Sequence, residues 1–149
     1  MKLYLLDTNI LLRIADTSSP QHHLVLTAIT NILSHGDKCV ITSQVLIEFW
    51  VVATRPVEVN GLGWTTQLTT EKLRQFITQF RLLQETEEIF ANWFKLVNTH
   101  KIKGKRTHDV RLLAIMIVYN IPYLLTFNSN DFITVSGITI IEPQNLLEN

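Results

Sequence analysis

Residues 2–14 read KLYLLDTNILLRI. The apolar run KLYLL (residues 2–6) ends at an acid, Asp7, and the polar pair Thr8 and Asn9 then opens a second apolar stretch with the character of a helix start. The pattern predicts a strand, a carboxylate at its end and a helix. In open parallel sheets, ligands bind outside the carboxyl ends of the strands, so Asp7 is predicted to lie where a ligand would bind.

The rest of the chain alternates helical patterns with short apolar runs. Apolar spacing and end signals predict helices at residues 22–34, 43–55, 69–80, 86–98 and 109–119, with Ser43, Thr69 or Thr70, and Thr86 as starting residues. Short apolar runs predict strands at residues 38–42, 82–83, 123–126 and 138–141. This order favours a three-layer α/β/α sandwich with a mainly parallel central sheet. A length of 149 residues suits one domain, so we expect residues 1–149 to form a single domain.

Composition excludes several classes of protein. Hydrophobic residues make up 46% of the chain and charged residues 17%, a globular balance rather than a disordered one. The longest apolar run, residues 112–119, is far shorter than the roughly 20 residues that span a bilayer. The single cysteine, Cys39, excludes an intrachain disulfide and is predicted to be a small buried hydrophobe; we expect a cytoplasmic protein without a membrane span. With 13 basic and 13 acidic residues, any nucleic-acid site must be local.

Four acids stand at the ends of predicted elements or among apolar neighbours: Asp7, Glu48, Asp109 and Asp131. A buried carboxylate needs a partner because removing its charge from water is costly, and few cations stand near Asp7 or Glu48 in the sequence. A divalent cation would be such a partner, and carboxylate oxygens suit Mg²⁺ or Mn²⁺. Such an ion activates a water and stabilises phosphoryl displacement, so phosphodiester hydrolysis is the expected reaction.

Five pieces of the sequence carry a family resemblance: DTN at residues 7–9, Glu48, HDVRLLAIMIVYNI at 108–121, LLTFNSNDF at 124–132 and ITIIEP at 138–143. Together they make the chain similar to the PIN-domain family, especially the VapC-like toxin ribonucleases. The resemblance implies a compact α/β/α sandwich and Mg²⁺- or Mn²⁺-dependent cleavage of single-stranded RNA. It also implies a homodimer and inhibition by a small cognate antitoxin protein.

The resemblance implies roles for the four acids. Asp7 and Asp109 match the two acids that hold the metal ion most directly. Glu48 matches the acid of the second motif, and Asp131 matches the fourth acid. At the fourth position Asn128 is an alternative, in which case Asp131 only caps a turn. Taken singly, each acid also has a plain structural reading, such as helix capping by Asp7.

Polar residues beside these acids would complete the site. Thr8, Asn9 and Thr126 are expected to orient carboxylates or waters, and Asn128 is a further candidate for this role. Asn120 stands where many relatives have glycine, and the left-handed conformation would accommodate it.

A basic loop, HKIKGKRTH at residues 100–108, precedes the last predicted helix. Five of the 13 basic residues fall within residues 101–111. The predicted contacts to RNA phosphates are made by Lys103, Lys105, Arg106 and Arg111. A solvated loop explains any one lysine about as well.

Aromatic residues and one histidine have less specific readings. Trp50 and Trp93 are predicted core residues. Trp64, on the glycine-containing loop at residues 56–66, either packs or stacks on a base. His108 is read as a residue at a helix boundary, with phosphate contact or proton transfer as alternatives.

Three functions stay open on the sequence alone. The first is a metal-dependent endoribonuclease, the toxin of a type II toxin–antitoxin pair. The second is a PIN-like module that binds RNA or a protein without cutting, although the presence of all four acids argues against it. The third is a phosphatase with Asp7 as nucleophile, which ranks last because Asn9 stands where such enzymes need a second acid.

Overall fold

The computed structural model describes residues 1–147, which form five strands, six α-helices and three short 3₁₀ helices. The strands are β1 (Leu3–Leu6), β2 (Lys38–Ile41), β3 (Arg81–Leu82), β4 (Tyr123–Leu125) and β5 (Thr139–Ile141). The α-helices are α1 (Thr8–Ala15), α2 (His22–Ser34), α3 (Ser43–Thr54), α4 (Thr66–Gln79), α5 (Glu87–Thr99) and α6 (Arg106–Tyr119). The 3₁₀ helices are η1 (Val57–Val59), η2 (Ser129–Asp131) and η3 (Pro143–Leu146).

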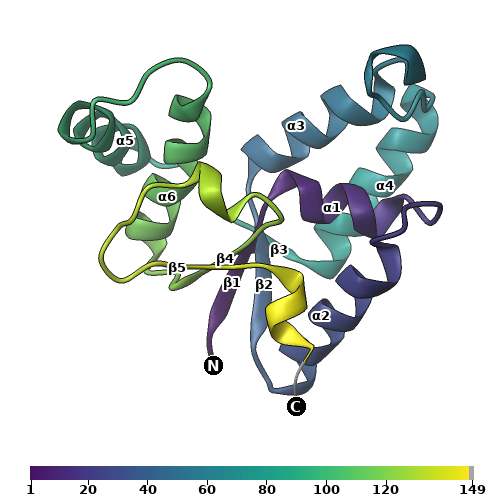
Figure 1. Ribbon diagram of the computed structural model, residues 1–149, viewed down its shortest axis with the longest axis horizontal. Helices are drawn as coiled ribbons and strands as arrows, with labels where there is room; N and C mark the ends of the chain where they lie inside the picture. The colour runs from purple at the N-terminus through teal and green to yellow at the C-terminus, as the bar shows by residue number, and fades with distance from the viewer. Residues whose placement is uncertain (148–149) are drawn as a thin grey trace.

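The sheet has the strand order β3-β2-β1-β4-β5, and every neighbouring pair is parallel. Helices α1 to α4 lie on one side of the sheet, and α5 and α6 lie on the other (Figure 1). This arrangement confirms the predicted three-layer α/β/α sandwich, with a sheet that is parallel throughout the described residues. Parallel neighbours need crossover connections. α-Helices supply each crossover except the one between β4 and β5, which contains only η2.

The order of the strands creates a crevice at the carboxyl end of β1. The chain adds β2 and β3 on one side of β1, and β4 and β5 on the other side. Such a reversal leaves an open crevice outside the carboxyl ends of the two strands that flank it. Leu6 pairs with Leu125, and the Asp7 N–H donates to the Leu125 carbonyl at 3.0 Å. The residues that directly follow β1 and β4 therefore meet at this crevice.

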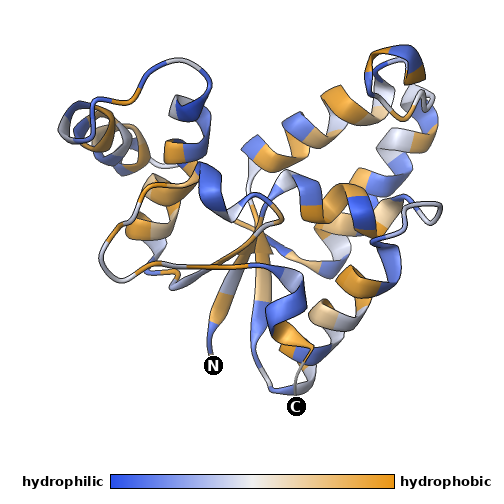
Figure 2. Ribbon diagram, in the orientation of Figure 1, coloured by the Kyte–Doolittle hydropathy of each residue, from blue (hydrophilic) through white to orange (hydrophobic). Residues whose placement is uncertain are grey.

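The core lies where the central strands meet the helices. Leu5 and Leu6 of β1 are fully buried, as are Leu124 and Leu125 of β4. Helix α6 buries Val110 and five consecutive residues, Leu112 to Met116. Figure 2 shows hydrophobic residues gathered on the strands and hydrophilic residues spread over the outer loops and helix ends.

Cys39 of β2 is also buried, with 4% of its surface exposed. Burial raises the pKa of its thiol to about 12. The prediction of a small buried hydrophobe is confirmed.

Helix α4 begins earlier than predicted, because a threonine upstream caps it. Thr65 is extended, and its Oγ1 accepts the Leu68 N–H at 3.1 Å. Thr69, one of the two predicted starting residues, instead lies inside the helix with Thr70. The Thr69 hydroxyl is buried and donates to the Thr65 carbonyl at 2.8 Å.

The caps of α3 and α5 also differ from the prediction. Thr42, rather than Ser43, caps α3, because its extended backbone lets Oγ1 accept the Val45 N–H at 3.2 Å. Thr86 directly precedes α5 as predicted, but its hydroxyl makes no capping hydrogen bond. Hydroxyl residues mark the start of a helix in the sequence, but neighbouring candidates differ only in backbone conformation.

Helix α6 begins earlier than predicted, and strand β3 is shifted by one residue. α6 begins at Arg106, three residues before the predicted start, so Asp109 lies in its first turn. Asn120 ends the helix in the left-handed conformation (φ 56°, ψ 44°), the one that accommodates asparagine in place of glycine. Strand β3 starts one residue earlier than predicted, although the Leu83 N–H still donates to the Ile41 carbonyl at 2.9 Å.

The predicted loop at residues 56–66 contains η1 and folds back on α3. The backbone N–H groups of Leu62 and Trp64 donate to carbonyls near the end of α3, at 3.0 and 2.8 Å. A Cβ at Gly61 would lie 1.9 Å from the Arg55 carbonyl oxygen, so only glycine fits this close approach. Trp64 consequently packs beside the core.

The placement of three other aromatic residues was predicted wrongly. The apolar spacing of residues 86–98 predicts that Phe90 lies on the inner side of this helix, but Phe90 is 64% exposed. Trp50 and Trp93 are only partly buried and lie outside the buried core. Helix α5 packs chiefly against α6, so one of its faces stays uncovered although its apolar spacing suggests a buried helix.

Candidate active site

Asp7 lies at the crevice directly after β1, with only 8% of its surface exposed. Its Oδ1 accepts the Thr8 N–H at 2.7 Å and so caps α1. Its Oδ2 accepts the Thr126 hydroxyl at 2.8 Å and is 3.4 Å from Asn9 Nδ2. Asp7 can therefore cap α1 with one carboxylate oxygen and take part in a binding site with the other, because the two oxygens have different neighbours.

A polar network connects the residues that follow β1 with those that follow β4. Asn9 Nδ2 donates to Thr126 Oγ1 at 3.1 Å, and Asn9 Oδ1 accepts the Phe127 N–H at 3.1 Å. Thr126 is fully buried, and its hydroxyl oxygen also accepts the Asn128 N–H at 3.0 Å. These bonds hold the Asp7 carboxylate in one orientation. This geometry suits the orienting role predicted for Asn9 and Thr126, which stays a prediction.

Thr8 connects Asp7 to the second acid. Glu48 comes from the middle of α3, which packs against α1. The Thr8 hydroxyl donates to Glu48 Oε1 at 2.8 Å, while the Thr8 backbone N–H donates to Asp7. One residue at the start of α1 thus positions two carboxylates.

Asp109 reaches the site from the other layer of helices. It lies in the first turn of α6, where the helix dipole favours an anion, and it is partly buried. No side-chain hydrogen bond to Asp109 is present within residues 1–147. Its carboxylate oxygens are therefore available to a ligand.

The fourth position has two candidates, Asn128 and Asp131, at the two ends of the segment that contains η2. Both residues are exposed. The charge of Asp131 raises the pKa of Asp7 and of Asp109, which places Asp131 within electrostatic reach of both. Asn128 is connected to the network only through its backbone N–H, so the electrostatics favour Asp131.

Burial and the charges of neighbouring acids disfavour the ionisation of Asp7 and Asp109. Burial, followed by the charges of Asp7, Asp131 and Glu48, raises the pKa of Asp109 to about 6, and His108 partly opposes this effect. Burial also raises the pKa of Asp7, although hydrogen bonds from Thr126 and Thr8 oppose the shift. Side chains from four segments thus form one electrostatically coupled cluster.

The donor chemistry of this cluster suits a hard divalent cation. Within residues 1–147, no three carboxylate, imidazole or thiolate side chains are close enough together to surround one ion as they stand. Mg²⁺ commonly takes only one or two protein carboxylates and keeps several waters, so a full protein cage is not required. Asp7 and Asp109 offer the carboxylate oxygens for such a mode of binding.

Arg111 is held by two residues that the sequence analysis did not single out. Its Nη1 donates to Gln44 Oε1 at 3.0 Å, and its Nη2 lies 2.7 Å from Glu85 Oε2 in an ion pair. Gln44 Nε2 in turn donates to the His108 carbonyl at 2.8 Å. These partners are 67 and 26 residues from Arg111 in the chain, so no local pattern could have identified them. The predicted RNA contacts Lys103, Lys105 and Arg106 are all exposed beside the start of α6.

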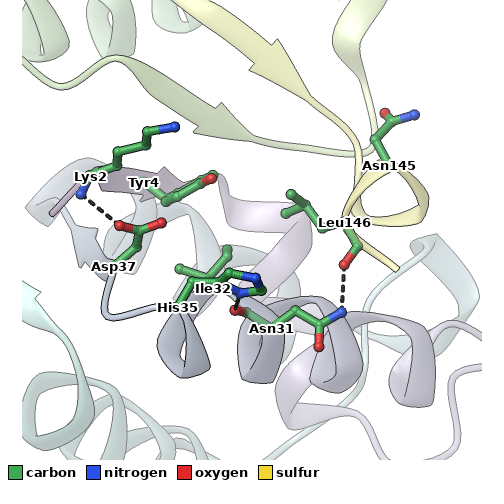
Figure 3. Close-up of a pocket in the computed structure, with 8 residues that line it drawn as sticks. All are labelled: Lys2, Tyr4, Asn31, Ile32, His35, Asp37, Asn145 and Leu146. Atoms are coloured by element: carbon green, nitrogen blue, oxygen red, sulfur yellow. Dashed lines mark hydrogen bonds between the residues drawn. The ribbon is translucent and has the colours of Figure 1, made fainter. Parts of the chain in front are cut away.

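A second polar pocket lies at the opposite edge of the sheet, before the first residues of β1 and β2 (Figure 3). There the Lys2 N–H donates to Asp37 Oδ1 at 2.8 Å, and Asn31 Nδ2 donates to the Leu146 carbonyl at 2.6 Å. Asp37 is the one carboxylate among the described residues that line it. The acid cluster at the carboxyl edge is therefore the stronger candidate site.

Solved structures with the same fold come from several bacteria. The chain is 17% identical to VapBC2 from Rickettsia felis bound to a promoter DNA fragment, with a TM-score of 0.68 over 94% of this chain and 98% of that one. It is 18% identical to VapBC-1 from nontypeable Haemophilus influenzae, with a TM-score of 0.70 over 95% and 98%. It is 13% identical to VapC20 of Mycobacterium tuberculosis, a toxin that cleaves the sarcin–ricin loop, with a TM-score of 0.63 over 89% and 98%.

The sequence itself carries the family assignment. No curated protein sequence matches this chain closely enough to be called a relative. No helix within residues 1–147 is long and apolar enough to cross a membrane. The family model of the PIN domain matches residues 4–138, which include all four acids of the cluster. The chain therefore belongs to the PIN domain family.

Proposed function

We propose that this chain is a Mg²⁺- or Mn²⁺-dependent endoribonuclease that cleaves single-stranded RNA, and that it is the toxin of a toxin–antitoxin pair. The observation that carries the proposal is the cluster of carboxylates at the crevice beside β1. Burial, followed by the charges of Asp7, Asp131 and Glu48, raises the pKa of Asp109 to about 6, so a nearby cation would favour the ionised carboxylate. A divalent ion would be such a cation.

Asp7 and Asp109 would hold the ion, with Glu48 and Asp131 around it. When bound, the ion would activate a water and neutralise charge on the scissile phosphate. The chain's own contribution is to position the carboxylates. Thr8 aligns Asp7 with Glu48, and the fully buried Thr126 fixes Asp7 Oδ2.

The proposal extends to partners and location. Two of the solved structures with this fold are VapBC complexes, which supports a small cognate antitoxin as partner. The family resemblance supports a homodimer, which sedimentation of the purified chain would test. A reduced, buried Cys39 is in keeping with the cytoplasm.

Cleavage of a mixed single-stranded RNA tests the catalytic proposal. Purified wild-type protein is incubated with Mg²⁺, with Mn²⁺ or with EDTA, alongside Asp7→Asn. The matched control is Asp37→Asn, which removes a carboxylate from the opposite edge of the sheet. We expect cleavage that requires metal, disappears in Asp7→Asn and persists in Asp37→Asn.

Two outcomes would contradict the proposal. Cleavage in EDTA, or by a folded Asp7→Asn variant, would show that the acid cluster does not hold a catalytic ion. Binding of RNA without cleavage by the folded wild type under any metal would favour the non-catalytic module. Circular dichroism of each variant separates loss of activity from loss of fold.

A further inference from the structure

Two pockets share His108 and Arg111 in their walls, and one of them is lined by Glu48 of the acid cluster. The α3–α6 pocket is lined by Gln44, Ile47, Glu48, Glu85, His108 and Arg111. The α5–α6 pocket is lined by Phe90, Trp93, Thr107, His108 and Arg111. Their volumes are about 510 and 220 Å³. Glu48 lines the first pocket, and His108 and Arg111 line both, so the two pockets are neighbours and the first of them reaches the candidate active site.

The side chains that line the two pockets suit ligands with flat rings and polar edges. Ile47 is 65% exposed and Phe90 is 64% exposed, so each pocket offers an uncovered apolar surface. Trp93 Nε1 donates to the Thr107 carbonyl at 2.8 Å, which fixes the indole ring in the wall of the second pocket. The Phe90 ring lies 5.6 Å from that of Trp93, centroid to centroid. Bases of single-stranded nucleic acid stack on such aromatic surfaces.

Arg111 lies between the two pockets in a fixed orientation. Gln44 and Glu85 each accept one of its hydrogen bonds, and 33% of its side chain stays exposed. A guanidinium has five N–H donors, so three remain for a ligand. Its charge is already paired with Glu85, which favours stacking of its planar face on a base over competition for a phosphate.

We propose that these two pockets bind two successive bases of the RNA strand beside the scissile phosphate. One base lies between Ile47 and Arg111 in the α3–α6 pocket, and the next stacks on Phe90 in the α5–α6 pocket. The basic residues Lys105 and Arg106, exposed where α6 begins, supply the charge complementarity for the phosphates of the same strand. This inference rests on the proposed function, since it names the subsites of the same site.

The test measures binding by the full chain with cleavage silenced by Asp7→Asn. A labelled single-stranded RNA of mixed sequence and an abasic ribose–phosphate strand of equal length are titrated by fluorescence anisotropy at one ionic strength. Into this parent we place Ile47→Ala or Phe90→Ala. The matched controls are Ile77→Ala, an exposed isoleucine on α4, and Leu33→Ala, an exposed leucine on α2; neither residue lines either pocket.

We expect Phe90→Ala to weaken RNA binding by about five- to a hundred-fold, the range for loss of one base stack, and to leave binding of the abasic strand unchanged. Ile47→Ala should also weaken RNA binding, whereas both controls should change it less than about two-fold. In the cleaving protein, Phe90→Ala should raise KM and leave kcat unchanged.

Three outcomes would overturn the proposal. Equal losses on the RNA and on the abasic strand would show that the pockets do not contact bases. If Ile47→Ala and Phe90→Ala bind RNA as tightly as Ile77→Ala and Leu33→Ala do, RNA does not enter the pockets. A changed oligomeric state of Phe90→Ala in sedimentation, with unchanged RNA affinity, would assign the surface to a protein partner. The proposed function itself fails only if the Asp7→Asn parent binds no RNA and the wild type cleaves none. That result differs from the three outcomes above, in which the parent still binds RNA.

Discussion

Replacing Asp109 with asparagine should stabilise the metal-free protein above about pH 6. The pKa of this carboxyl rises from 3.8 to about 6 on folding, chiefly through burial and then through the charges of Asp7, Asp131 and Glu48. Each unit corresponds to about 1.4 kcal/mol, so ionisation of Asp109 destabilises the folded state by at most about 3 kcal/mol. The side chain is only partly buried, and solvent screening lowers the expected gain for Asp109→Asn to about 1–2 kcal/mol.

The sign of this effect depends on pH in a defined way. Below pH 3.8 the Asp109 carboxyl is neutral in both states, so asparagine brings no electrostatic gain. Between pH 3.8 and about 6, Asp109 ionises more readily in the unfolded chain than in the folded protein, so the free energy of unfolding falls as the pH rises. Above about pH 6 the penalty is complete, and Asp109→Asn should show its full advantage.

Urea denaturation in EDTA, at about pH 4 and about pH 8, measures the difference in unfolding free energy between variant and wild type. Glu87→Gln is the matched control, because Glu87 also lies in the first turn of a helix, α5, but is exposed. That control should be neutral or slightly destabilising at both pH values. If Asp109→Asn is less stable than the wild type at the higher pH, or gains equally at both, the acids do not repel one another as argued.

Three further predictions concern the Thr126 hydroxyl, the metal site and the end of α6. Thr126→Val should lower the unfolding free energy by about 1–3 kcal/mol, because it removes a buried hydroxyl that donates to Asp7 and accepts from Asn9; Thr126→Ser should restore stability in urea denaturation. Mg²⁺ at about 100 times its Kd should raise the unfolding free energy of the wild type by about 2.7 kcal/mol, and equal stabilisation of Asp7→Asn would refute the metal site. Asn120→Ala should cost about 1 kcal/mol in the same assay, while Asn120→Gly should cost nothing, because residue 120 has φ of 56°.

The sequence predicts the framework of this fold well, because the framework follows from local apolar patterns. Helix α2 has the predicted bounds, and each predicted strand is present to within one or two residues. Strand order was not predicted, because it depends on pairings between distant segments. The most informative feature, the reversal of strand order at β1, became visible only in the structure.

The candidate site was likewise predicted only where it depends on local sequence. The carboxylate at the end of β1 was predicted from a strand that ends at an acid, and its hydrogen bond to Thr126 joins residues 119 positions apart. The family resemblance, rather than periodicity, singled out Thr126. The partners of Arg111 and the exposure of Phe90 were missed, because both depend on which face of α5 and α6 is covered.

The position of the acid cluster explains why a stable fold tolerates it. The raised pKa values of Asp7 and Asp109 mean that ionisation of these acids destabilises the metal-free protein, but both acids adjoin elements of the core, β1 and α6. Leu5 and Leu6 of β1 are fully buried, and Leu113 of α6 is buried equally. Each such side chain contributes about 1.5–3 kcal/mol, which is comparable to the cost of ionising one crowded carboxylate. Because β1 and α6 are anchored in the core, they hold Asp7 and Asp109 at fixed positions without a bound ion, whereas Glu48 comes from α3 and Asp131 from η2.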